Sequence, residues 1–147
     1  MLEIHHRIGL ESSIPADLVV VLSHEQRERG RMLLNSECGV EVRLFLQRGQ
    51  PLMVGEYLQS LCGKIVQVQG AFEEIAQAQC NDWPTFARAC YHLGNRHVKI
   101  QVGERSVQIK PDHVLEDMLL QLGLQIEYKS SIFTPESGAY KHAPHQP

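Results

Sequence analysis

The amino-acid sequence predicts an α+β fold in two parts. We expect an all-β domain of residues 1–71, a mixed domain of residues 72–139 and a short flexible tail of residues 140–147. Up to Gly70, short aliphatic runs alternate with turn residues, which is typical of strands. After Gly70, segments with helical periodicity are interleaved with segments of period two, which indicates mixed structure.

The first half contains strand-like runs and turns but no convincing helical pattern. Residues 17–23 (DLVVVLS) and 31–49 (RMLLNSECGVEVRLFLQRG) are rich in aliphatic and β-branched residues, with residues 35–39 as a hairpin-type loop. Glycine and proline between positions 49 and 55 break any helix there. Residues 63–70 (GKIVQVQG) alternate again, so this half is predicted to be all-β.

The second half begins with residues 72–80, a plausible strand although its Glu, Ala and Gln are helix formers. A helix is predicted at residues 83–93, because Asp82 can cap it and Pro84 is tolerated in a first turn. Its apolar residues recur at helical spacing: Trp83, Phe86, Ala87, Cys90 and Leu93. Gly94 and Asn95 are the expected stop, since both accept the left-handed conformation that ends helices.

A hairpin and a second helix follow. Residues 98–109 have period two, and Gly103 with Glu104 fits a two-residue type II′ turn. A helix is then predicted from Asp112, its N-cap, to Gly123, its C-terminal stop. Residues 124–130 (LQIEYKS) form the last strand. The order β-α-β-β-α-β is the ferredoxin-like arrangement, with two helices on one face of an antiparallel sheet.

Composition excludes several function classes. The 147 residues include 14 basic and 17 acidic side chains, a net charge of -3, which does not favour nucleic-acid binding. The amino terminus lacks the pattern of a signal peptide, and no run approaches the ~20 apolar residues of a membrane span. We therefore expect a soluble, cytoplasmic protein. Its four cysteines form no CxxC pair and are expected to be free thiols, mostly buried in the core: Cys38, Cys62, Cys80 and Cys90.

No catalytic motif is present: the sequence has no GxSxG elbow, phosphate-binding loop, HExxH or GxGxxG. We therefore expect no enzyme activity. Five arginines of the first half are the other charged feature: Arg27, Arg29, Arg31, Arg43 and Arg48. They are interpreted as a solvated edge that resists strand-to-strand aggregation or as a basic surface for a protein partner.

Histidine is the unusual component, with eight in the chain. If Val98, Ile100 and Val102 face the helices, His97 lies on the uncovered face of the sheet or at its rim. That face is available for another subunit, and a residue near a two-fold axis meets its own copy, so a dimer would supply two His97 ligands. His142 and His145 in the tail could add further ligands. Imidazole suits Ni, Zn and Cu, although a histidine at such a joint can also be a capping residue.

The other histidines have simpler interpretations. His92 and His113 are expected to be structural, and His5 and His6 to be solvent-exposed bystanders.

Several stretches resemble one known family. Residues 89–102 (ACYHLGNRHVKIQV), 112–124 (DHVLEDMLLQLGL) and 133–140 (FTPESGAY) are similar to the UreE family of urease accessory proteins, which are nickel metallochaperones. Residues 26–31 (QRERGR) and 45–58 (FLQRGQPLMVGEYL) resemble the amino-terminal pattern of that family. The likeness therefore extends over nearly the whole chain.

The resemblance implies a partner-binding β domain and a ferredoxin-like domain that forms a homodimer and binds metal. It implies that His97 binds nickel at the dimer interface, with Zn(II) or Cu(II) as competitors. It also implies delivery to the urease apoprotein with accessory proteins that include a GTPase.

The sequence departs from the pattern of some relatives at three places. Pro111 stands where some relatives carry a second histidine, Cys80 matches a cysteine that can bind softer metals, and His142 and His145 replace a polyhistidine tail. The main alternative is a protein-recognition module of the urease assembly complex that binds metal incidentally. An RNA-binding protein is a third alternative and a more distant one than the recognition module. The predicted strands lack the paired exposed aromatic residues on which RNA bases stack.

Overall fold

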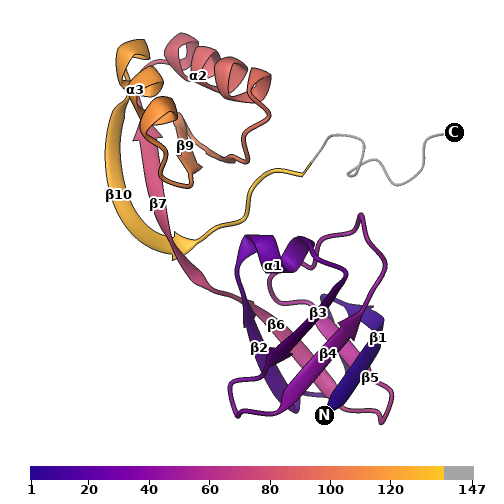
Figure 1. Cartoon of the computed structure of the whole chain (residues 1–147). Coiled ribbons are helices and arrows are strands. Elements are labelled where there is room, and N and C mark those ends of the chain that lie inside the picture. Colours follow the sequence, from indigo (N-terminus) through magenta and orange to yellow (C-terminus); the bar gives the residue numbers. More distant parts are fainter. Residues whose placement is uncertain (138–147) are drawn as a thin grey trace, which may run out of the picture. The chain divides into compact units, whose positions relative to one another are not determined.

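The computed structural model describes residues 1–137 (Figure 1). The chain divides into two compact units, one of Met1–Ala71 and one that begins at Phe72. We describe each unit by itself. The predicted tail, with His142 and His145, lies outside the described residues. Among those residues, no helix is long and apolar enough to cross a membrane.

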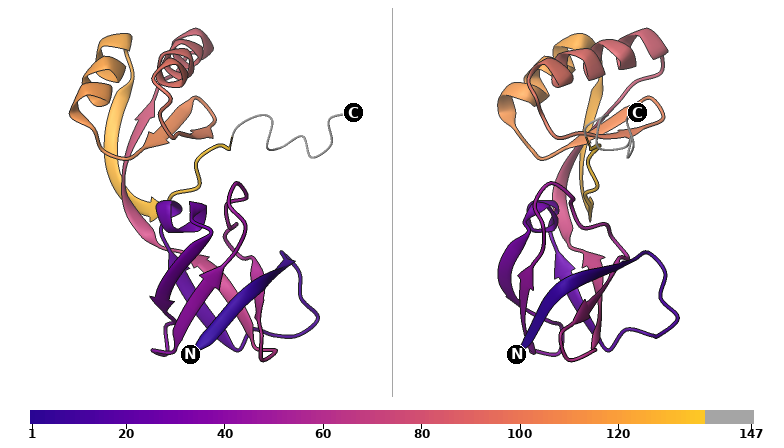
Figure 2. Two further views of the ribbon diagram at one scale, coloured as in Figure 1. Left: turned by 45° about the vertical axis from the view of Figure 1, so that its right-hand side comes forward. Right: turned by 90° about the vertical axis from the view of Figure 1, so that its right-hand side faces the viewer.

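The first unit is a six-stranded sheet in the order β2-β6-β5-β1-β4-β3, with one short helix. Figure 1 shows its strongly twisted strands, and Figure 2 shows the same unit from two further sides. The elements are β1 (Leu2–Gly9), β2 (Leu18–Leu22), α1 (His24–Glu28), β3 (Arg31–Asn35), β4 (Glu41–Phe45), β5 (Tyr57–Ser60) and β6 (Ile65–Gly70).

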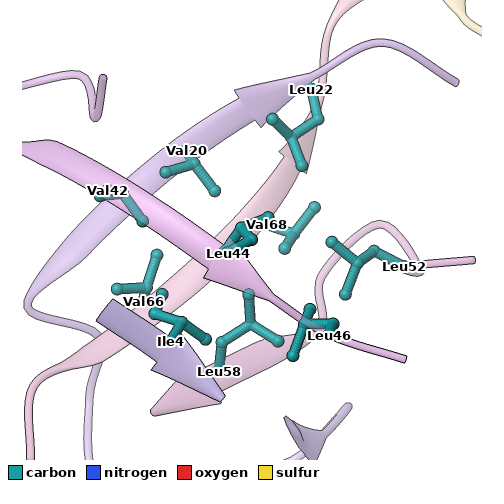
Figure 3. Close-up of a cluster of buried hydrophobic side chains, with 10 residues drawn as sticks. All are labelled: Ile4, Val20, Leu22, Val42, Leu44, Leu46, Leu52, Leu58, Val66 and Val68. Carbon is teal, nitrogen blue, oxygen red and sulfur yellow. The ribbon is translucent and has the colours of Figure 1, made fainter. Parts of the chain in front are cut away.

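The core of this unit is aliphatic. Ten buried side chains form it (Figure 3): Ile4, Val20, Leu22, Val42, Leu44, Leu46, Leu52, Leu58, Val66 and Val68. Val42 and Leu44 are two residues apart in β4, as are Val66 and Val68 in β6, so alternate positions of each strand point inward. Complete burial of such a side chain contributes about 1.5–3 kcal/mol, which makes this cluster the main stabilising feature of the unit.

Helix α1 corrects the prediction that the first half has no helix. The Ser23 hydroxyl accepts a hydrogen bond from the backbone N–H of Gln26, and the Gln26 side chain accepts one from the Ser23 N–H. This reciprocal capping box is visible in the sequence as Ser-x-x-Gln. A helix of five residues is too short to show a hydrophobic period, so the cap was the only signal.

Arg27 does not belong to an exposed basic edge. Only 4% of it is accessible, and its guanidinium donates to the backbone carbonyl of Leu22 at 2.9 Å. The Arg27 carbonyl also accepts from the N–H of Leu52 at 2.7 Å, which holds the loop before β5 against α1. Arg29, Arg31 and Arg48 are exposed. Exposure fits both interpretations of these arginines, a solvated edge and a basic surface for a protein partner.

An ion pair between Arg7 and Glu56 fixes the same loop. Glu56 is 4% exposed and accepts two hydrogen bonds from Arg7, from Nε at 2.6 Å and from a terminal nitrogen at 2.7 Å. The Arg7 guanidinium also donates to the carbonyls of Gln50 and Pro51. Because the buried carboxylate is paired in a bidentate geometry, it connects β1 to the loop without leaving an unsatisfied charge.

The second unit is a four-stranded antiparallel sheet in the order β10-β7-β9-β8. Its elements are β7 (Phe72–Gln79), α2 (Trp83–Asn95), β8 (Gln101–Gly103), β9 (Ser106–Ile109), α3 (His113–Leu122) and β10 (Gln125–Ile132). The predicted order of strands and helices is therefore present. Figure 2 shows both helices on the same side of the strands. The core between them contains Ala76, Ala78, Ala89, Leu93, Val107, Ile109, Leu119 and Leu124.

The predicted caps of the helices are confirmed at three of four ends. The Asp82 carboxylate accepts from the N–H of Thr85 at 2.9 Å. The pKa of Asp82 is lowered first by a hydrogen bond with the Thr85 side chain and then by this backbone bond. Asp112 accepts from the N–H groups of Val114 and Leu115. Gly123 ends α3 in the left-handed conformation, with φ of 103°. The fourth end, that of α2, differs from the prediction and is described with the candidate site.

The hairpin turn lies one residue later than predicted. Gly103 is a strand residue that pairs with Ser106, and the two-residue loop is Glu104 and Arg105, with φ of 52° at Arg105. A Cβ at Gly103 would lie 2.6 Å from the Ser106 hydroxyl oxygen, so a larger residue there would require that hydroxyl to rotate. Val102, expected to face the helices, is 42% exposed because β8 is a three-residue edge strand.

Replacing Gly30 by alanine should destabilise the first unit. A Cβ at Gly30 would overlap the carbonyl oxygen of Leu46 and lie 3.3 Å from the backbone nitrogen of Arg48, and neither backbone atom can move freely. We expect a loss of about 1–3 kcal/mol in urea unfolding. The exposed Gln47→Ala should stay within about 0.5 kcal/mol of wild type. Equal stability of the two variants would contradict this account of Gly30.

Candidate metal centre

His97 occupies the turn that ends α2. The N–H of His97 donates to the carbonyl of Gly94 at 3.0 Å, and the N–H of Val98 donates to the carbonyl of Leu93 at 3.3 Å. This pair of bonds defines a Schellman motif, in which the left-handed residue is usually glycine. Here that residue is His97, with φ of 56°. Gly94 and Asn95, which we predicted as the stop, are the last residues of the helix.

The left-handed conformation of His97 is energetically costly. For a residue with a Cβ, the cost is roughly 1–2 kcal/mol, and such strained residues cluster at functional sites. Val98 and Leu93 both pack in the core of the unit, so the hydrophobic contact of the motif supports the turn. The His97 side chain is exposed. A turn that glycine would form more easily therefore presents an imidazole to solvent.

The carboxyl-terminal segment returns to the residues that follow His97. The N–H of Glu136 donates to the carbonyl of Ile100 at 2.7 Å, and the N–H of Thr134 donates to the side-chain oxygen of Gln101 at 3.0 Å. Phe133 anchors this segment because its side chain is completely buried. The chain thus passes beside residues 100 and 101 immediately before the part that contains His142 and His145.

One chain does not supply a complete metal site within residues 1–137. In that part of the molecule, no three His, Cys, Asp or Glu side chains converge to hold an ion. A metal bound at His97 would need ligands from beyond residue 137 or from another molecule. The structure therefore places His97, whereas His142 and His145 lie outside the described residues.

The remaining histidines lie in separate places. His92 is half-buried in α2 and contacts the Tyr91 ring edge-on, with centroids 5.2 Å apart. His113 is the exposed first residue of α3. His5 and His6 are exposed on β1, as expected, although His5 also stacks on Phe45. His24 is buried in α1.

The cysteines are free thiols, but the prediction that most are buried was wrong. Cys38 and Cys62 are exposed, and Cys80 and Cys90 are half-buried. The Cys80 thiol lies 3.4 Å from the carbonyl oxygen of Asp82 and donates to it. Burial is the main cause of the raised pKa of Cys90, and the neighbouring Cys80 adds to it. Cys80 thus packs beside the core of the second unit while its thiol bonds to a backbone carbonyl.

The second unit has a surface cavity away from His97. It has a volume of about 420 Å³ and is lined by Gln79, Cys80, Asn81, Asp82, Glu104, Arg105, Gly123 and Gln125. Arg105 donates to the carbonyl of Asn81 at 3.0 Å, and its guanidinium lies 5.4 Å from the centre of the Trp83 ring. The lining contains no histidine, so the cavity adds nothing to a nitrogen-based metal site.

Comparison with known proteins assigns both units to one family. Residues 3–71 match the UreE urease accessory protein N-terminal domain, and residues 73–147 match the C-terminal domain. The chain is 59% identical over 142 residues to the urease accessory protein UreE of Marinomonas sp. (strain MWYL1), which covers 97% of both chains. It is 45% identical over 126 residues to UreE of Alteromonas mediterranea, covering 86% of this chain and 82% of that protein.

A third relative, UreE of Psychromonas ingrahamii, is 39% identical over 140 residues, covering 95% of this chain and 91% of that protein. The chain has two units, a β-rich unit followed by a mixed α and β unit, and each unit corresponds to one of the two domain matches. It therefore belongs to the UreE family of urease accessory proteins.

The strain at His97 can be measured by substitution. His97→Gly and His97→Ala both remove the imidazole, but only glycine adopts a positive φ without cost, so the glycine variant should be about 1 kcal/mol more stable. Urea unfolding with hydrogen exchange of the α2 amides would measure it. As a control, Tyr91 is an exposed helical position, where Tyr91→Ala should be about 1 kcal/mol more stable than Tyr91→Gly. An alanine variant at position 97 as stable as the glycine variant would contradict the strain.

Two turns of the first unit share a Ser-x-Cys-Gly pattern, at residues 36–39 and 60–63. In each, the serine hydroxyl lies 3.2 Å from the cysteine sulfur. The pKa of Cys62 is lowered, first by the hydrogen bond with Ser60 and then by the Lys64 backbone. Ser60→Ala should raise that pKa, leave less thiolate at a given pH and slow alkylation.

The measurement is the pH profile of iodoacetamide labelling at Cys62, with peptide mapping by mass spectrometry. Ser36→Ala serves as the control, because it alters the turn of Cys38 and should leave Cys62 unchanged. An identical Cys62 profile in wild type and Ser60→Ala would disprove the role of the hydroxyl.

Proposed function

We propose that this chain is a nickel-binding metallochaperone that delivers Ni(II) for assembly of the urease active site and binds the ion at a homodimer interface. Membership of the urease accessory family gives the biological context. The observation that carries the proposal is His97: an exposed imidazole in a strained turn where glycine is the usual residue.

The arrangement of the second unit supports a ferredoxin-like assignment. With its strands numbered 1 to 4 along the chain, the sheet order is 4-1-3-2, all neighbours are antiparallel and both helices cover one face. We assign dimerisation and metal binding to this unit and partner binding to the β-rich unit. No step of this function is catalytic, because an accessory protein carries and transfers its cargo.

Two-fold symmetry explains how one exposed histidine serves as a metal site. At a two-fold axis, His97 meets His97 of a second chain, so the dimer supplies two imidazole ligands to one ion. The lack of three converging ligands within residues 1–137 of one chain fits such sharing. Neutral imidazole suits Ni(II), and it also suits Zn(II) and Cu(II), which are the expected competitors.

The carboxyl-terminal segment is attached to Ile100, three residues after His97, at a point a few residues before His142 in the sequence. His142 is six residues beyond Glu136, which bonds to Ile100. An extended chain spans at most about 3.3–3.6 Å per residue, so His142 cannot be more than about 22 Å from this attachment. We propose that His142 and His145 supply additional ligands that join and leave the ion during transfer.

The proposed partners are the urease apoprotein and the accessory proteins of its assembly, including a GTPase, in the cytoplasm. The second candidate function is a protein-recognition module of that complex with incidental metal binding. Exposed apolar side chains on the first unit favour it, namely Leu33, Met53 and Leu61. Arg31→Glu tests this candidate, whereas Arg27 is unsuitable because it is buried and its reversal would disturb folding.

Nickel titration by calorimetry at near-neutral pH tests the proposal. Loss of groups that merely orient a ligand typically costs 10–100-fold in metal affinity, so His97→Ala should weaken the first ion by about a hundredfold or more. A chain that ends at Tyr140 should keep the first ion and lose only additional coordination. His113→Ala is the matched control, an exposed histidine outside the proposed site, and should bind as wild type does.

Unchanged nickel affinity in His97→Ala would refute the proposed site. Loss of partner binding in Arg31→Glu, together with nickel binding that does not depend on His97, would favour the recognition module.

A further inference from the structure

The outer edge of the second sheet is an open strand. β10 pairs with β7 over eight consecutive residues, from Gln125 opposite Gln79 to Ile132 opposite Phe72. Within residues 1–137, no strand pairs with its other edge, and Figure 1 shows β10 on the side of β7 away from β9. At the opposite edge, β8 has only three residues, and the preceding Ile100 carbonyl bonds to Glu136.

β10 lacks most of the features that protect edge strands. Proteins usually blunt such edges with short strands, proline, bulges or several charges. β10 has eight residues without proline, and its register with β7 is continuous, so there is no bulge. Its only charged residues are Glu127 and Lys129, and neither forms an ion pair within the described part of the chain.

The sequence of β10 is complementary to itself in one antiparallel register. If a two-fold axis passes through Tyr128, Glu127 of one chain lies opposite Lys129 of the other, and the same pair occurs again across the axis. Opposite charges in such cross-strand positions stabilise a sheet. A register centred on Glu127 or on Lys129 would instead place two like charges opposite each other, which is destabilising. The charges therefore select the register centred on Tyr128.

Apolar surface lies at the same edge. Tyr128 is 61% exposed although its hydroxyl donates to the carboxylate of Glu116 on α3. Leu120 follows Glu116 by four residues, so it lies on the same side of the helix, and it is 53% exposed. Pairing of two β10 strands would bring Tyr128 against its own copy and bring the two α3 helices near each other, covering these side chains.

We propose that β10 is a self-association edge, to which a second copy of this chain adds in antiparallel register about a two-fold axis at Tyr128. The contact is separate from the proposed His97 interface, because β8 and β10 are opposite edges of the sheet. One strand pair and a few side chains bury less than a standard interface, so the association is weak and depends on concentration. Two different two-fold contacts per chain would join dimers into larger assemblies, which close as tetramers when the two axes intersect at right angles.

Charge reversal and charge exchange test this register. Glu127→Lys places lysine opposite Lys129 twice in the pair, and Lys129→Glu places glutamate opposite Glu127 twice. Each single variant should raise the dissociation constant of self-association by about tenfold. The double variant Glu127→Lys/Lys129→Glu restores two opposite-charge pairs and should recover the wild-type value. Sedimentation equilibrium of the full chain in EDTA, over a wide concentration range, gives these constants.

Two controls separate this contact from the His97 site. Glu74→Lys reverses another exposed charge of the same sheet, on β7, and should not change self-association. The wild type, the two single variants and the double variant should show the same ranking of dissociation constants when each also carries His97→Ala. A wrong metal proposal would therefore leave the outcome of this test unchanged. Equal association constants for wild type and both single variants, or no recovery in the double variant, would overturn the proposed edge.

Discussion

The turn at His97 is the constraint on which the second unit depends. Its left-handed conformation ends α2 and directs Val98 back into the core, where the carbonyl of Leu93 accepts its N–H. The next residues then reach β8, and Ile100 bonds to Glu136 of the returning chain. Because packing and hydrogen bonds around the turn determine its shape, a strained residue is tolerated at its apex. The same turn leaves the imidazole in solvent.

Much of the fold follows from local signals in the sequence. Asp112 and Gly123 mark the ends of α3 because an N-cap carboxylate and a left-handed glycine act within one turn of a helix. The hairpin at Gly103 could not be placed to the residue, because the left-handed position of the turn is occupied by Arg105 and not by the glycine. Helix α1 was missed because only its capping box, starting at Ser23, distinguishes it from a loop.

The candidate site was less accessible to sequence reasoning. His97 is exposed, but as the apex of a turn and not on a face of the sheet, because β8 begins only at Gln101. The end of the helix was assigned to Gly94 and Asn95, which adopt the left-handed conformation at a lower energetic cost. The choice of His97 depends on the whole Schellman motif, including the contact of Val98 with the core. The burial of Arg27 could not be predicted either. Its hydrogen-bond partner is the backbone carbonyl of Leu22, and every residue has such a carbonyl, so the sequence does not mark the partner.

The central claim is that one ion is shared by two copies of His97. Chains of wild type and His97→Ala can be mixed to form three kinds of dimer, and native mass spectrometry counts the nickel ions in each. If the ion is shared, the wild-type dimer holds one ion at limiting nickel. The mixed dimer then holds no ion, like the dimer in which both chains carry His97→Ala. A mixed dimer that holds nickel as tightly as wild type would show that each chain binds its own ion.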